Sequence, residues 1–88
     1  MKALEWGDLW AAMKDTPDKW IPTTQAMFFE MLGAVPPARQ LQNSFLVGEP
    51  ARHNENNEAV YSCFKMSGGR VYAKDMTIAE YEADPSCR

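Results

Sequence analysis

His53, the only histidine, is the most obvious candidate for chemistry, because histidine can take up and release a proton near neutral pH. It lies in a polar stretch beside Arg52 and close to Glu55 and Glu58. General acid–base catalysis would need a positioned partner and a pocket around this side chain, and the local sequence signals neither. We interpret His53 as a solvated loop residue and predict no catalytic residue in this chain.

The two cysteines, Cys63 and Cys87, could bind a metal or join in a disulfide. Together with His53 they lack the closely paired spacing of zinc sites, so the sequence predicts no metal and no cofactor. A disulfide could link them, but a secreted scaffold of this size usually carries more cysteines. We therefore expect two free thiols in a reducing cytoplasm.

Glu49 stands between Gly48 and Pro50, at the end of an expected strand. Its carboxylate could bind a basic group of a partner, or it could be a structural turn residue, which is the favoured interpretation. The run Ser67-Gly68-Gly69 could be read as an anion-binding nest. A phosphate loop needs a further glycine and a lysine that leads into a helix, so we interpret this run as a hairpin turn.

Three tryptophans, Trp6, Trp10 and Trp20, lie in a short N-terminal region that prolines interrupt. Such a region cannot easily bury all three, so either they cover a sheet as core or one of them anchors a partner. Trp20 and Trp10 are the candidate anchors. Trp20 is the better one, because it lies between Pro17 and Pro22 on a connection rather than in the apolar stripe of a helix.

A second aromatic group falls on one face of the expected sheet. Tyr61 and Tyr72, with Lys65 and Arg70 nearby, could stack the bases of a single-stranded nucleic acid. The net charge of −3 argues against this alternative, because proteins that bind nucleic acids usually carry a basic face.

The elements that must position these residues point to one α+β domain over residues 1–88. Residues 1–33 are predicted to be mainly helical, with Asp8 capping a first helix. A second helix is expected to begin at Thr23 or Thr24 and to end at Leu32. Pro22 should end any helical turn in the segment that precedes it.

Residues 44–75 are predicted to form a small antiparallel sheet of about three strands, packed against two or three short helices. The strands are expected at 45–47, 59–66 and 70–74, with a solvated connection over 52–58. The closing helix, 77–83, is marked by Thr77-Ile78-Ala79-Glu80, a capping box.

The bulk properties of the chain fit this picture. Its 88 residues are enough for one core, and 45% of them are hydrophobic. The N-terminus has acids where a signal peptide needs an apolar stretch, and no segment approaches the roughly 18 apolar residues that span a membrane. We expect a cytoplasmic protein without a membrane partner.

Four short runs carry a resemblance to a known family. They are Met31-Leu32-Gly33-Ala34-Val35-Pro36-Pro37, Phe45-Leu46-Val47-Gly48-Glu49-Pro50, Tyr61 with Phe64, and Met76-Thr77-Ile78-Ala79-Glu80-Tyr81. Over residues 20–82 the chain resembles a small bacterial family labelled domain of unknown function 1419. The resemblance implies a bacterial or mobile-element origin and a cytosolic setting. It implies no activity and no functional residues.

These observations favour a non-enzymatic interaction module, bacterial or phage-encoded, that binds and modulates a larger host protein or nucleoprotein complex. An inhibitor of host defence, of the anti-CRISPR type, is one concrete version. The alternative is a nucleic-acid-binding regulator that uses the face of Tyr61 and Tyr72. The oligomeric state stays open.

Overall fold

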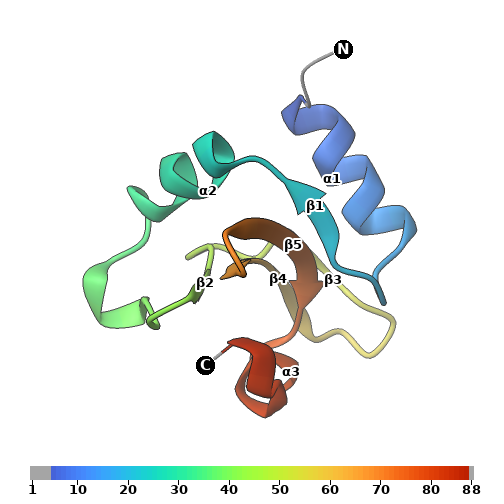
Figure 1. The fold of residues 1–88 in the computed structure, drawn as a ribbon. Helices are drawn as coiled ribbons and strands as arrows, with labels where there is room; N and C mark the ends of the chain where they lie inside the picture. The colour runs from blue at the N-terminus through green and yellow to red at the C-terminus, as the bar shows by residue number, and fades with distance from the viewer. Residues whose placement is uncertain (1–4, 88) are drawn as a thin grey trace.

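A computed structural model describes residues 5–87 of the chain. The helices are α1 (Trp6–Asp15), α2 (Gln25–Leu32) and α3 (Ile78–Ala83), with 3₁₀ turns at Pro37–Arg39 and Pro85–Cys87. The strands are β1 (Ile21–Thr23), β2 (Ser44–Leu46), β3 (Arg52–His53), β4 (Ala59–Ser67) and β5 (Arg70–Met76). The α+β class is therefore confirmed, with five antiparallel strands where the sequence predicted about three (Figure 1).

The centre of the sheet is the hairpin of β4 and β5, which pair from Tyr61 opposite Met76 to Ser67 opposite Arg70. Two residues close it, Gly68 with φ 59° and Gly69 with φ 77°. A two-residue turn of this kind needs positive φ at both positions, which glycine adopts without a steric penalty. The predicted hairpin turn is confirmed.

The two unpredicted strands are short and lie at the margins of this hairpin. β1 pairs with β5 and forms one edge of the sheet. Pro22 lacks an N–H to donate, but an edge strand tolerates proline because its other side has no neighbouring strand. β3 pairs with the start of β4, opposite Val60 and Ala59, in the stretch that the sequence predicted as a solvated connection. The nine residues of β4 are long enough to pair with both β2 and β3.

The helices follow their local signals with one difference. α1 begins at Trp6, so Asp8 lies in its first turn instead of capping it. The predicted cap of α2 is confirmed, because the Thr24 side chain accepts a hydrogen bond from the Met27 N–H at 3.1 Å. The first four residues of the predicted helical region lie outside the described part of the chain.

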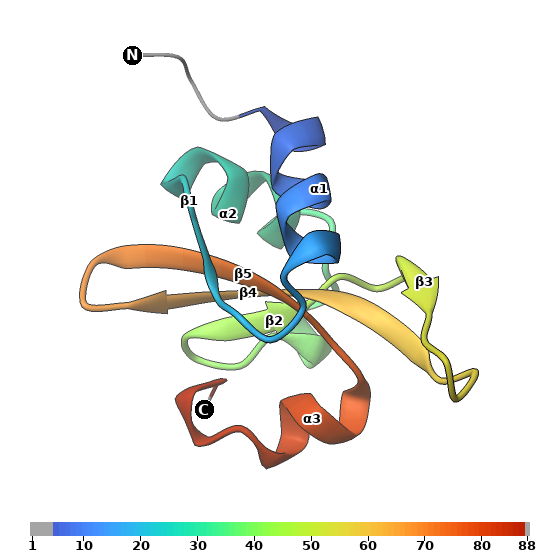
Figure 2. The ribbon, with the colours of Figure 1, turned by 90° about the vertical axis from the view of Figure 1, so that its right-hand side faces the viewer.

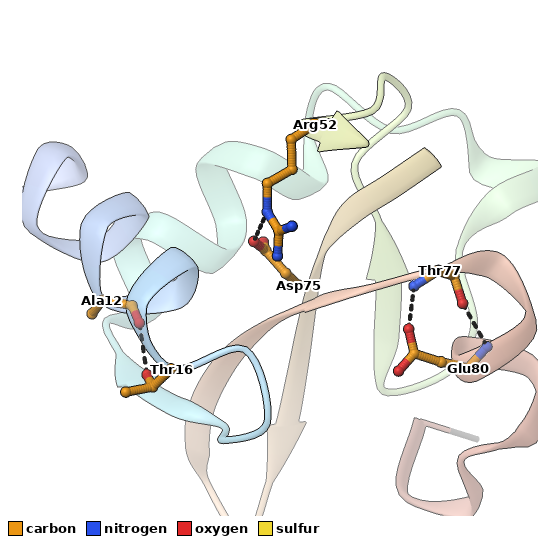
Figure 3. Close-up of polar contacts among 6 residues, drawn as sticks. All are labelled: Ala12, Thr16, Arg52, Asp75, Thr77 and Glu80. Carbon is orange, nitrogen blue, oxygen red and sulfur yellow. Dashed lines mark hydrogen bonds and ion pairs between the residues drawn. The ribbon is translucent and has the colours of Figure 1, made fainter. Parts of the chain in front are cut away.

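The capping box of α3 is also confirmed. The Glu80 N–H donates to the Thr77 hydroxyl at 3.1 Å, and the Thr77 N–H donates to the Glu80 carboxylate at 2.9 Å (Figure 3). The helix then ends at Ala83 and leads into the turn Pro85–Cys87.

Both faces of the sheet are covered, each by its own cluster of buried side chains. α1 and α2 lie over one face, where Leu9, Met13, Phe28, Phe45 and Phe64 form the larger core. α3 and the C-terminal turn lie on the opposite face, as Figure 2 shows. There Cys63, Met76, Tyr81 and Cys87 form a smaller core, with Trp20 and Leu46 packed against it.

Candidate protein-binding groove

A hollow of about 710 Å³ lies between the segment around β2 and helix α3. Its lining is mostly apolar and comes from four parts of the chain that are distant in sequence. The lining residues are Arg39, Leu41, Gln42, Leu46, Val47, Tyr61, Ile78, Tyr81 and Glu82. We call this hollow the α3 groove. Its size and apolar lining are typical of sites that receive a ligand or a segment of another protein.

Two large apolar side chains on its walls are exposed, Leu41 at 46% and Ile78 at 48%. Local structure holds both of them outside the core. Ile78 is the first residue of α3, directly after the Thr77 cap, and Leu41 lies in a tight turn in which its N–H donates to the Ser44 carbonyl at 2.9 Å. Exposed apolar residues that share one hollow mark an interaction surface better than scattered ones do.

A buried hydrogen bond holds the floor of the groove in place. Tyr81 is buried, and its hydroxyl shares a 2.9 Å hydrogen bond with the Ser44 hydroxyl, which joins α3 to β2. Burial raises the pKa of the Tyr81 phenol above its ordinary value, so the phenol stays neutral in the physiological range. A partner would therefore meet a preformed surface, which lowers the entropic cost of binding.

The rim of the groove carries charge. Arg39 is exposed, and its guanidinium forms no ion pair with any residue in the range 5–87. On the other side, α3 contributes Glu82. A cation that is not already paired is available to an acidic group of a partner.

Of the residues that the sequence singled out, only Tyr61 lies in the α3 groove. Trp10 and Glu49 line a separate hollow of about 460 Å³, together with Arg52 and Asp75. Trp10 is exposed at 36% and stacks on Trp6, with ring centroids 5.3 Å apart.

Trp20 lies elsewhere, under the ammonium group of Lys65, which is 3.9 Å from the centroid of the indole ring. Lys74 approaches the same ring at 5.7 Å. Trp20 is half-buried and packs against the smaller core. One face of its ring is thus occupied by the protein itself.

Tyr61 and Tyr72 share a face of the sheet but do not meet. Tyr72 is paired with Lys65, which is four residues along β4 from Tyr61, so the two rings are about 13 Å apart along the strand. Lys65 is buried, and its ammonium donates to the Ser86 hydroxyl at 2.9 Å. Bases stacked on both Tyr61 and Tyr72 would have to span the distance between the two rings, and the Lys65 ammonium would not be available to contact their backbone.

His53 is exposed at the end of β3, and it lines a different hollow from Glu49. The preceding residue, Arg52, forms an ion pair through its Nε with Asp75 Oδ2 at 3.2 Å (Figure 3). Asp75 is 8% exposed, and burial raises the pKa of its carboxyl while Arg52 opposes the shift. This pair links β3 to β5 across the hollow.

Sequence reasoning missed Leu41, Ile78 and Arg39. Leu41 carries a local signal, because it is an apolar residue in the otherwise polar stretch 39–43. Ile78 also carries a local signal. It is an apolar residue at the first position of α3, and the buried residue of that helix, Tyr81, comes three positions later. Neither signal shows that the two residues line the same hollow.

No family model, no curated protein and no solved structure matches this chain. Among residues 5–87 there is no cluster of three or more histidine, cysteine or acidic side chains that could hold a metal ion. None of the helices in that range has the length and apolar character that a membrane crossing requires.

Proposed function

We propose that this protein is a non-enzymatic interaction module that docks a segment of a larger protein into the α3 groove. The observation that carries the proposal is the pair of exposed apolar side chains, Leu41 and Ile78, on the walls of a hollow whose floor includes Tyr61 and Tyr81. An apolar side chain that enters the groove would bury surface on both walls at once. Central, well-packed anchors of this kind supply most of the binding energy of protein interfaces.

The positive charge of Arg39 at the rim indicates which kind of partner segment the groove would bind. Arg39 has no acidic partner among the described residues, so a docked segment with a carboxylate next to its apolar anchor would complete the pair. The occupant we propose is therefore a protein segment with an aromatic or branched aliphatic residue close to an aspartate or glutamate. Such a module would bind and modulate a larger bacterial or host complex. An anti-defence inhibitor of the anti-CRISPR type is one concrete version.

A peptide-display selection on the immobilised protein tests this chemistry directly. We expect the enriched peptides to carry an apolar anchor beside an acid. Ile78→Asp should weaken their binding by about thirtyfold, which corresponds to the loss of a hot-spot contact of about 2 kcal/mol. An acid at the first position of a helix is favourable for the helix dipole, so this variant should fold.

Phe29→Asp is the matched control. Phe29 is exposed at 55%, but it lies on α2, which covers the opposite face of the sheet. It should leave peptide binding unchanged, while Arg39→Glu should weaken the acidic peptides and spare neutral ones. Peptides that bind Ile78→Asp as well as the wild type, or a selection with no apolar-acidic motif, would contradict the proposal.

The same variants extend the test to the natural complex. Proteins captured from a bacterial lysate by the wild type should be lost with Ile78→Asp and kept with Phe29→Asp. A partner that all three proteins capture would place the interface elsewhere on the surface.

A further inference from the structure

Cys63 and Cys87 come from different elements of the fold and lie in the same smaller core. Cys63 is in the middle of β4, Cys87 ends the C-terminal 3₁₀ turn, and both are fully buried. Neither is in a disulfide. Both belong to the four-residue buried cluster of the smaller core, with Met76 and Tyr81, so β4 and the C-terminal turn bring the two thiols into the same packed interior.

The turn that carries Cys87 is held mainly by side-chain contacts. The Lys65 ammonium donates to the Ser86 hydroxyl, and the Ser86 hydroxyl and N–H donate to the Asp84 carboxylate at 2.7 and 2.8 Å. The Ser44 hydroxyl also donates to the Cys87 carbonyl. A short segment held in this way can open locally without unfolding the sheet, and such opening gives a reagent access to Cys87.

We propose that Cys63 and Cys87 form a reversible oxidation site, which low-molecular-weight disulfides convert to an intramolecular disulfide between β4 and the C-terminal turn. The inference is independent of the docking proposal. It depends on two thiols that separate elements, β4 and the C-terminal turn, place in one buried cluster.

The two thiols differ in how readily they ionise. The neighbouring Cys63 thiol lowers the pKa of the Cys87 thiol, whereas Cys87 and burial raise the pKa of Cys63. Cys87 is thus the thiol that ionises first, and the thiolate is the nucleophile in exchange.

The reaction then follows thiol–disulfide exchange. The Cys87 thiolate attacks one sulfur of the small disulfide, whose S–S bond breaks and releases one thiol. Cys63 next attacks the Cys87 sulfur of the mixed disulfide, and the second small thiol leaves. The two protein thiols lose two electrons and two protons, and the small disulfide gains them as two thiols.

Equilibration of the protein in buffers of reduced and oxidised glutathione tests the proposal. After acid quenching, alkylation in denaturant and intact mass measurement will count the thiols. We expect a species two hydrogens lighter than the reduced chain and without alkyl groups. Its midpoint in the folded protein should lie at a glutathione ratio about tenfold more reducing than in urea, because folding holds the two thiols together.

Cys63→Ala and Cys87→Ser are the controls. Cys63→Ala should give only the mixed disulfide of Cys87 with glutathione, and in folded Cys87→Ser the buried Cys63 should stay reduced. A midpoint in the folded protein that is equal to, or less reducing than, the midpoint in urea would overturn the proposal. So would a folded wild-type protein that accumulates glutathione on Cys87 without closing the ring, or one that forms only disulfide-linked dimers.

Discussion

The Lys65 ammonium lies 3.9 Å from the centroid of the Trp20 ring and donates a hydrogen bond to Ser86. One cation therefore ties together the connection before β1, the central strand β4 and the C-terminal turn. Lysine is rarely buried unless its charge has partners. Here the indole face and the serine hydroxyl are those partners, so Trp20 and Lys65 support each other in the fold.

Trp20→Ala should therefore lower the stability of the fold. We expect a loss of about 2 kcal/mol in the free energy of unfolding, below the roughly 3–5 kcal/mol for a fully buried aromatic, because Trp20 is half-buried. Urea denaturation followed by circular dichroism will measure it.

Trp20→Phe is the control for this contact, since it keeps an aromatic face under the ammonium and should retain most of the stability. If Trp20→Ala melts like the wild type but loses a partner, Trp20 is an interface anchor, as the sequence analysis expects. The two outcomes separate the roles of this residue.

Single-stranded nucleic acid should bind weakly or not at all. Lys65 is engaged with Trp20 and Ser86, and Tyr61 and Tyr72 do not form a continuous platform. We expect the fluorescence anisotropy of a labelled oligonucleotide to show no complex tighter than about 100 μM at physiological salt, the weak end of nonspecific binding. A tighter complex whose affinity falls steeply with salt would favour the nucleic-acid alternative.

Asp75 should make the fold less stable as the pH rises. Burial raises the pKa of its carboxyl above the ordinary 3.8, so the folded state holds this proton more tightly than the unfolded chain does. Its contribution to stability is complete below pH 3.8 and is lost as the pH rises through the raised pKa. The difference in unfolding free energy, wild type minus Asp75→Asn, should therefore fall between about pH 3 and pH 7.

Asp84 provides a control of opposite sign. Hydrogen bonds from Ser86 lower the pKa of its carboxyl, so its contribution is present above pH 3.8 and is lost as the pH falls. The same difference measured with Asp84→Asn should rise across that range. Equal slopes for the two variants would show that the environments of the two carboxyls do not differ as the structure indicates.

Thr77→Ala should cost about 1 kcal/mol of unfolding free energy, because the N–H of Glu80 loses its acceptor at the start of α3. Chemical denaturation will measure the change. Thr77→Ser keeps the hydroxyl and should lose much less. An alanine variant as stable as the wild type would mean that the cap contributes nothing to the fold.

Local signals were enough to predict the parts of the fold that short-range contacts determine. The Gly-Gly turn, the Thr24 cap and the Thr77-Glu80 box depend on neighbours within a few residues. β1 was missed because Pro22 reads as a breaker in the sequence, and only its place at an edge makes it compatible with a strand. β3 was missed because its polar residues pair only where β4 extends past β2.

The candidate site was harder to predict for the same reason. Leu41 and Ile78 lie far apart in sequence, and their shared hollow exists only after α3 has packed on the sheet. Tyr61 was identified as a candidate contact from its place on a strand face. Its neighbours in the groove come from tertiary packing, which no local pattern records.

The position of β1 has a consequence for the order of folding. β4 and β5 are adjacent in sequence, and a hairpin of this kind forms on a timescale of about 1–10 μs. β1 must return from the other end of the chain to place Ile21 opposite Ala73, and such distant pairings form more slowly. Until β1 arrives, β5 presents an unpaired edge, and at that stage the chain is most prone to pair with another copy of itself.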